Sequence, residues 1–129
     1  MLGRYPGDTY DGDTAEPAAR DHPWALSTAI FAELYYQLAQ QTSSGTVPLD
    51  SLSATFFSQI GVSASTTPAA ATTALEGAGD QMLQALVFHS DHLELSEQFD
   101  ATSGYEKSVS DLSWSYASFL SAVRAKNAI

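Results

Sequence analysis

Apolar residues recur at helical spacing in four stretches of the chain, the first of which covers residues 24 to about 41. Its apolar positions form one stripe with aromatic residues on the other side, namely Leu26, Ile30, Leu34 and Leu38, then Trp24, Phe31 and Tyr35. Glu33 is the only charged residue in this stretch. A helix that is apolar nearly all round is buried on most faces, so we expect an inner helix. Asp21 and Pro23 before it are typical of an N-cap followed by a first-turn proline.

The next two stretches predict a second and a third helix. Residues 49–60 carry a narrower apolar stripe, and Gly61 follows at the position that a C′ glycine takes. Residues 68–89 predict the third helix, which starts with a proline and which Thr66 or Thr67 can cap.

The fourth predicted helix begins at Ser108, and Asp111 three residues later matches the capping-box pattern. Residues 1–22 and 90–107 carry no sustained period, so we expect loops there and no long strand. The whole pattern predicts an all-α fold of about four antiparallel helices in one domain, residues 1–129.

The amino-acid composition argues against several classes of binding partner. The chain has 15 Asp and Glu residues against 5 Lys and Arg, which gives a net charge of -10. This charge repels phosphate, so nucleic acids and anionic membranes are poor partners, whereas a neutral sugar is unaffected. The lack of cysteine excludes disulfides and thiolate metal sites. No apolar run reaches the roughly 18 residues of a membrane span, and the first residues lack the regions of a signal peptide.

Glu97 is the main candidate for chemistry. It lies in an acidic loop just before the aromatic fourth helix, which contains Trp114. A loop that doubles back would bring this carboxylate to the first turn of that helix, whose positive end favours the ionised form. An ionised carboxylate beside a tryptophan face suits a base that activates water next to a sugar ring. The alternative is a solvated acidic loop, and the residue pattern alone leaves both open.

Other polar residues also have a functional and a structural interpretation. Arg4 can donate a fixed fork of hydrogen bonds to sugar hydroxyls, or it can form a surface salt bridge. His89 and His92 flank Asp91 and could contribute to a metal site. No third ligand accompanies them, so neither a metal nor another cofactor is predicted.

Several motifs resemble those of glucoamylases, the fifteenth glycoside hydrolase family. They are LGRYPGDTYDG at the start, HPW at the opening of the first helix, and SEQFD followed by DLSWSYA. Their order and rough spacing match too, so the resemblance covers essentially the whole chain. It implies that the chain is the C-terminal third of an (α/α)6 toroid whose inner helices surround a funnel-shaped active site. It also implies inverting hydrolysis of terminal α-1,4-linked glucose from the non-reducing ends of starch-like polysaccharides.

The resemblance assigns roles to individual residues. Glu97 takes the place of the glutamate that serves as general base, and Ser108 takes the place of the serine that hydrogen-bonds it. Arg4 takes the place of the arginine that contacts the sugar. The other positions with an implied substrate-binding role are Tyr5, Asp8, Trp24 and Trp114.

The chain departs from the family pattern in places. Gly7 stands where glutamate is usual, His22 stands where asparagine is common, and the loop of residues 13–21 is a few residues longer. Inversion also needs a general acid, which the family carries in a tryptophan-glutamate-glutamate motif upstream of GRYP. This chain contains no such motif. We therefore expect a partial catalytic domain that is inactive alone and whose partner is the remainder of the toroid.

The resemblance makes starch or a malto-oligosaccharide the expected substrate, and it makes the full-length protein secreted, although this chain shows no signal peptide. Two other interpretations stay open. One is a non-catalytic acidic helical module that binds a partner or an oligosaccharide through its aromatic face. The other keeps the enzyme class and changes the substrate to another α-glucoside, such as trehalose or isomaltose.

Overall fold

Three long helices dominate the computed structural model, which describes residues 1–13, 21–47 and 49–129. They are α1 (Ala25–Ser43), α3 (Pro68–His89) and α4 (Ser113–Lys126). The shorter elements are α2 (Ala54–Ser58) and a two-stranded antiparallel hairpin, β1 (Gln98–Phe99) and β2 (Glu106–Lys107). The predicted all-α class is therefore confirmed. None of the described helices is long and apolar enough to cross a membrane.

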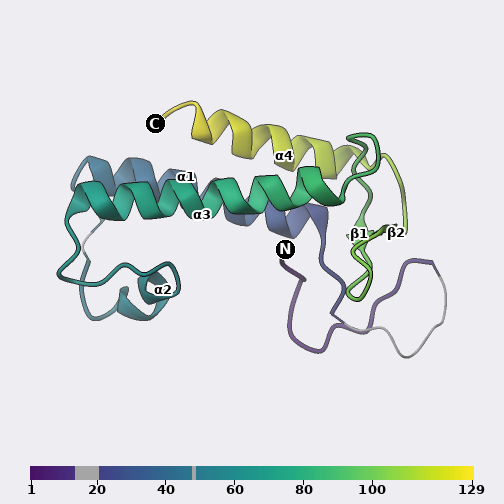
Figure 1. Ribbon diagram of the computed structural model, residues 1–129, viewed down its shortest axis with the longest axis horizontal. Helices are drawn as coiled ribbons and strands as arrows, with labels where there is room; N and C mark the ends of the chain where they lie inside the picture. Colours follow the sequence, from purple (N-terminus) through teal and green to yellow (C-terminus); the bar gives the residue numbers. More distant parts are fainter. Residues whose placement is uncertain (14–20, 48) are drawn as a thin grey trace.

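Helix α1 packs against both α3 and α4, and the loops gather at one end of this layered bundle (Figure 1). At that end α1 and α4 begin, α3 ends, and the hairpin lies beside the N-terminal segment (Figure 1). The helices thus form a scaffold that presents the N-terminal loop and the hairpin together.

Small residues on α1 allow the close packing of this bundle. The buried alanines of α1 belong to two hydrophobic clusters, and they are Ala25, Ala29, Ala32 and Ala39. Tyr36 is fully buried between α1 and α3, where a Cβ atom on Gly79 would lie 2.7 Å from its ring. Helix α1 is buried on most faces, as expected, but one stripe of it faces solvent, where Ile30 is 50% exposed and Leu34 is 36% exposed. The alanines of α1 lie in the core, whereas Ile30 and Leu34 face solvent.

Two of the predicted helix boundaries are confirmed. Thr67 is the N-cap of α3, its side chain accepts a hydrogen bond from the Ala70 amide, and Pro68 follows at the first helical position. Gly61 has φ +74 and donates to Ser58, while Val62 donates to Phe57, which is the pair of hydrogen bonds of a Schellman motif.

The predicted start of the second helix is wrong, because only Ala54–Ser58 is helical. The Asp50 carboxylate accepts hydrogen bonds from the amides of Leu52 and Ser53, and this turn delays the helix. The predicted N-cap at Asp21 is also wrong. Asp21 has φ 59 and its carboxylate accepts from the amides of residues 7 and 8, whereas α1 begins at Ala25 after Trp24.

The predicted start of the fourth helix at Ser108 is wrong as well. Helix α4 begins at Ser113, and Ser108 and Asp111 both have positive φ, with values of 68 and 51. Their side chains have tertiary partners in place of capping roles, since the Ser108 hydroxyl donates to Glu97 and the Asp111 carboxylate accepts from Tyr116. The capping-box pattern therefore arises from two residues with separate tasks.

Candidate active site

Backbone hydrogen bonds hold Glu97 at the end of the bundle where α1 begins. Its amide donates to the carbonyl of Val109 at 2.8 Å, and its carbonyl accepts from the amide of Ala25 at 3.2 Å. The next residue, Gln98, forms an isolated antiparallel bridge with Trp24. The segment is thus fixed on one side to the start of α1 and on the other to the loop before α4.

The Glu97 side chain is nearly buried and is hydrogen-bonded by hydroxyl groups. Glu97 is 7% exposed, and its Oε2 accepts a 2.5 Å hydrogen bond from Ser108 Oγ and a 3.5 Å one from the Tyr10 hydroxyl. A carboxylate held in this way is not a solvated loop residue. Its hydrogen-bond donors within the described residues are these two hydroxyls.

Gly12 lies directly against the Glu97–Ser108 pair. A Cβ atom at this position would lie 1.8 Å from Ser108 Oγ and 3.1 Å from Glu97 Oε2. Gln98 holds this loop in place, because its Oε1 accepts from the Gly12 amide at 3.1 Å and its Nε2 donates to the Tyr10 carbonyl at 3.2 Å. Sequence analysis missed Tyr10, Gly12 and Gln98, and only the position of Gln98 next to Glu97 could have singled it out.

Arg4 and Asp8 form a clamp beside this pair. The guanidinium donates to both oxygens of the Asp8 carboxylate, at 2.7 and 2.8 Å, and lies 4.5 Å from the centroid of Trp24 and 4.9 Å from that of Tyr10. These hydrogen bonds lower the pKa of Asp8 to about 2 and raise the pKa of Arg4. Asp8 itself is 1% exposed, so the group presented to solvent is the guanidinium, which aromatic rings hold from two sides.

Aromatic rings surround the clamp. Trp24 is buried and lies 5.7 Å from Tyr10 and 6.2 Å from Trp114, measured between ring centroids. Trp114 and Tyr5 are 44% and 58% exposed. The indole nitrogen of Trp24 is buried and has no hydrogen-bond partner among the described residues. The structure therefore brings Arg4 and the two tryptophans together, with Tyr5 at the solvent edge.

A second ionic contact joins the N-terminal loop to the hairpin. Lys107 Nζ lies 2.9 Å from Asp11 and 3.3 Å from Asp13, and these contacts, that with Asp11 above all, raise the pKa of Lys107. His22 is fully buried, and its Nδ1 accepts a 3.1 Å hydrogen bond from the Ala101 amide. His22, where the family pattern commonly has asparagine, thus anchors the turn of the hairpin, and it stands 3.6 Å from the Asp11 carboxylate.

The histidines considered as metal ligands do not converge. His89 Nδ1 is 3.0 Å from the Gly104 carbonyl, while His92 is exposed and pairs with its neighbour Asp91 at 2.5 Å. Within the described parts of the chain, no group of three or more acidic, histidine or cysteine side chains could hold a metal ion. The candidate chemistry therefore lies with Glu97 and its neighbours.

Comparison with known proteins gives consistent matches along the chain. A sequence profile described as glycosyl hydrolases family 15 matches residues 1–124. The chain is 33% identical to Glucoamylase 1 of Rhizopus oryzae, over 97% of this chain and 22% of that protein. It is 34% identical to Glucoamylase-1 of Schizophyllum commune, over 98% of this chain and 22% of that protein.

Solved structures match as well. The glucoamylase of Saccharomycopsis fibuligera superposes with a TM-score of 0.80 at 28% identity, covering 98% of this chain and 29% of that one. The glucoamylase of Hormoconis resinae superposes with a TM-score of 0.77 at 29% identity, covering 96% and 22%. This likeness confirms the predicted fold class, an all-α chain that matches part of an (α/α)6 toroid. The chain spans about a quarter of the length of the curated relatives it matches.

Proposed function

The chain belongs to glycosyl hydrolases family 15, and we propose that residues 1–129 form the part of a glucoamylase-like catalytic domain that carries the general base. The reaction is inverting hydrolysis of terminal α-1,4-linked glucose from the non-reducing ends of starch or malto-oligosaccharides. The observation that carries this proposal is the nearly buried Glu97 carboxylate, hydrogen-bonded by Ser108 at 2.5 Å.

In this proposal Glu97 is the general base that takes a proton from the attacking water. Both hydroxyl donors, Ser108 and Tyr10, engage Oε2, and among the described residues no hydrogen bond reaches Oε1. We therefore assign Oε1 to the water. As the water oxygen attacks the anomeric carbon, Oε1 takes one of its protons, and the bond to the leaving sugar breaks on the opposite face. The product carries the new hydroxyl in the β configuration.

The clamp beside Glu97 holds the sugar. Arg4 presents fixed donors to sugar hydroxyls, and Asp8 acts through Arg4 because it lies buried beneath the guanidinium. Trp24 and Trp114 supply apolar faces for the sugar ring, and Tyr5 extends this surface at the solvent edge. The net charge of -10 does not oppose a neutral substrate.

The general acid lies on the remainder of the toroid, which is the partner of this chain in the proposal. Inverting hydrolysis needs two carboxyl groups about 6.5–9.5 Å apart with the water on the side of the base. The protein that contains the complete domain acts outside the cell, where its polymeric substrate is found.

A chimera tests this proposal. Residues 1–124 replace the matching segment of the Saccharomycopsis fibuligera glucoamylase, which aligns with 99% of this chain. We expect the chimera to hydrolyse maltose and to release β-glucose, detected by proton NMR before the anomers equilibrate. The 129-residue chain alone should show no hydrolysis.

The outcome that contradicts the proposal is a chimera that unfolds cooperatively, binds maltose and does not cleave it, which would favour the non-catalytic module. Release of α-glucose would contradict inversion. Faster cleavage of trehalose or isomaltose than of maltose would contradict the assigned substrate. Hydrolysis by the isolated chain would contradict the assignment of the acid to the remainder of the toroid.

A further inference from the structure

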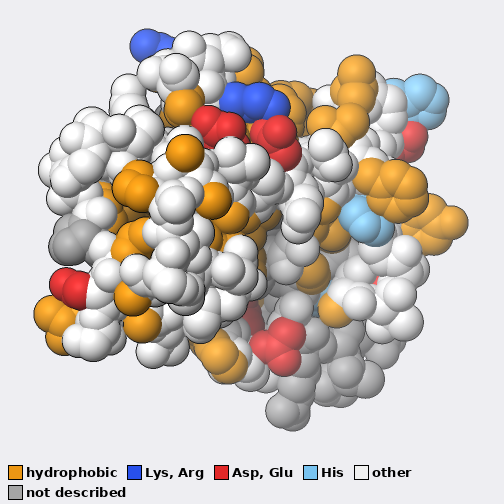
Figure 2. Space-filling view, turned by 60° about the vertical axis from the view of Figure 1, so that its left-hand side comes forward, with side chains coloured by type: hydrophobic (Ala, Val, Ile, Leu, Met, Phe, Trp, Pro, Cys, Tyr) orange, Lys and Arg blue, Asp and Glu red, His pale blue; other side chains and the backbone are white. Residues whose placement is uncertain are grey.

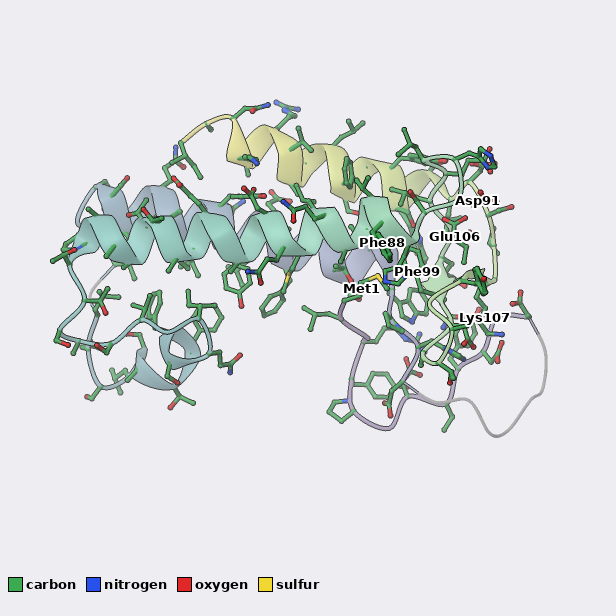
Figure 3. The ribbon with its side chains drawn as sticks, viewed as in Figure 1. Met1, Phe88, Asp91, Phe99, Glu106 and Lys107 are labelled. Carbon is green, nitrogen blue, oxygen red and sulfur yellow. The ribbon has the colours of Figure 1, made fainter. Side chains whose placement is uncertain are left out.

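Three side chains form a buried cluster between the N-terminal loop and the hairpin, next to the site around Glu97. Asp11 lies at its centre, with Lys107 Nζ 2.9 Å from Oδ1 and His22 Nε2 3.6 Å from Oδ2. The side chains of His22, Asp11 and Lys107 are 0%, 4% and 16% exposed. Figure 3 shows Lys107 where the hairpin meets the N-terminal segment. The cluster therefore joins two segments that are far apart in the sequence.

Burial distinguishes this ion pair from pairs at the surface. Figure 2 shows a basic side chain lying against acidic ones on the surface of one face. Lys126 and Asp80 form an exposed pair, with side chains 47% and 35% exposed, and pairs in water constrain the chain little. A buried carboxylate, by contrast, loses its hydration and needs a close partner of opposite charge. The hydrogen bond to Asp11 above all raises the pKa of Lys107, which keeps the lysine charged.

The two partners of the buried pair are sequence neighbours of the groups that hydrogen-bond Glu97. Asp11 follows Tyr10 in the N-terminal loop. Lys107 precedes Ser108 at the end of the hairpin. The hydroxyls of Tyr10 and Ser108 both donate to Oε2 of Glu97. Consecutive Cα atoms are only about 3.8 Å apart, so a displacement of either partner reaches the adjacent donor directly.

His22 lies on the other side of the Asp11 carboxylate. The Ala101 amide donates to Nδ1 of His22 at 3.1 Å, so Nε2 carries the proton of the neutral ring. Nε2 is the nitrogen that lies near Oδ2 of Asp11, while Oδ1 meets Lys107. The fully buried imidazole, fixed by the turn of the hairpin, therefore lies behind the carboxylate and leaves it facing the lysine.

The groups proposed to hold the sugar have other anchors. Asp8 holds Arg4 through two hydrogen bonds, and the backbone bridge to Gln98 holds Trp24. Trp114 lies in the first turn of α4. Loss of the buried ion pair should therefore disturb the hydroxyls at the base more than the surface that binds the substrate.

We propose that Asp11 and Lys107 are positioning residues for Glu97. Their ion pair closes the N-terminal loop onto the hairpin, which keeps the hydroxyls of Tyr10 and Ser108 on Oε2 and leaves Oε1 for the attacking water. The effect on turnover rests on the proposed function, in which Glu97 is the general base. The closure of the loop rests on the contacts alone.

A purely structural ion pair is the competing interpretation, and a double variant separates the two. Lys107→Met leaves the Asp11 carboxylate buried without its lysine, which lowers stability. Lys107→Met combined with Asp11→Asn removes both charges, so much of the stability should return. If the pair were purely structural, turnover would return with it. In a positioning role turnover stays low, because nothing closes the loop.

Maltose hydrolysis by variants of the chimera tests the proposal, with turnover referred to folded protein. We expect Lys107→Met to lower kcat roughly 10- to 100-fold while KM changes less than about 2-fold, because small displacements of a catalytic group act on the chemical step. Lys107→Arg keeps the charge and donates to the same carboxylate, so its kcat should stay within about 3-fold of the native value. The double variant should unfold near the urea concentration of the native chimera and keep the low kcat of Lys107→Met.

Asp13→Asn is the matched control. Asp13 contacts the same lysine at 3.3 Å, but its side chain is 44% exposed. An exposed partner contributes little, so Asp13→Asn should turn over as the native chimera does, whereas Asp11→Asn should lower kcat.

Hydrogen–deuterium exchange, followed by mass spectrometry, adds a readout that does not depend on catalysis. The amides of Gly12 and Glu97 are hydrogen-bonded to Gln98 and to the loop before α4, so peptides that contain them report the closed loop. We expect exchange in these peptides to be at least about 5-fold faster in Lys107→Met than in Asp13→Asn, with exchange in α3 unchanged.

The proposal is overturned if Lys107→Met keeps the native kcat, if its loss appears in KM, if Lys107→Arg does not recover turnover, or if the double variant recovers it. Equal exchange in Lys107→Met and Asp13→Asn overturns it as well. A native chimera that does not hydrolyse maltose, together with faster exchange in Lys107→Met, would count against the proposed function alone.

Discussion

Replacement of Gly12 by alanine should dislodge Ser108 from Glu97. The new Cβ atom would lie 1.8 Å from Ser108 Oγ and 2.5 Å from Ser108 Cβ, distances at which one of the two residues must move. The loop around Gly12 is held by Gln98, so the serine side chain is the group expected to move. The 2.5 Å hydrogen bond to Glu97 is then broken.

The loss of stability in Gly12→Ala can be estimated for each of two outcomes, in which Ser108 either stays in place or moves away. If Ser108 stays, overpacking costs about 1–3 kcal/mol. If it leaves, the chain loses a hydrogen bond to a charged group, worth about 1.5–3 kcal/mol. Either way we expect Gly12→Ala to lower the free energy of unfolding by about 2 kcal/mol.

Ser108→Gly provides the second arm of a double-mutant cycle. It also loses the hydrogen bond to Glu97, but glycine relieves a backbone with φ 68, a gain of about 1 kcal/mol. In the Gly12→Ala background it removes both clashing atoms. We therefore expect the double variant to be more stable than the sum of the single changes predicts, by at least about 1 kcal/mol.

Urea unfolding of the four chains measures these free energies. Gly77→Ala is the control, because a Cβ atom on this helical glycine meets nothing within 4 Å and should stabilise α3 slightly. The reasoning is refuted if Gly12→Ala is as stable as the native chain, or if the two changes are simply additive.

Two further predictions concern the clamp and the helix packing. Hydrogen bonds from Arg4 lower the pKa of Asp8 from 3.8 to about 2, so the stabilisation from this pair is complete above pH 3.8 and is lost as the pH falls through about 2. Between pH 5 and pH 2 the free energy of unfolding, measured with urea, should therefore fall by about 1–2 kcal/mol, a size limited by the partial exposure of Arg4. Asp8→Asn should abolish this fall, and the same pH profile in the variant as in the native chain would contradict the prediction. Gly79→Ala should cost about 1–3 kcal/mol in thermal unfolding, since its Cβ atom would lie 2.7 Å from the Tyr36 ring, whereas Gly77→Ala should cost nothing; equal melting temperatures would contradict the packing argument.

Local chemistry explains the helix boundaries that could be predicted from the sequence. The start of α3 depends on Thr67 and Pro68, and the end of α2 depends on Gly61, all of which act within one turn. The start of α4 could not be found in this way. Ser108 and Asp111 match a local capping pattern, yet their partners are Glu97 and Tyr116, and a local pattern carries no information about such contacts.

The residues of the candidate site also separate into those that local motifs predict and those that depend on contacts between distant parts of the chain. Glu97 and Arg4 lie in short motifs and Ser108 lies between two of them, so the resemblance is enough to single them out. The contact of Tyr10 with Glu97 joins residues 87 positions apart, and the approach of Gly12 to Ser108 depends on the same folding of the N-terminal loop onto the hairpin. The exposure of Ile30 could not be predicted either, because helical periodicity does not say whether alanines or larger residues face the neighbouring helix.

The most direct test of the central claim is the turnover number of Glu97→Gln in the chimera, compared with that of Glu94→Gln. Both changes remove one carboxylate from the same loop, but Glu94 is exposed and Glu97 is held by Ser108. If Glu97 is the general base, its replacement should lower the turnover number by roughly 10²–10⁴-fold, while Glu94→Gln leaves it unchanged. Equal turnover in the two folded variants would contradict the assignment of Glu97 as the base.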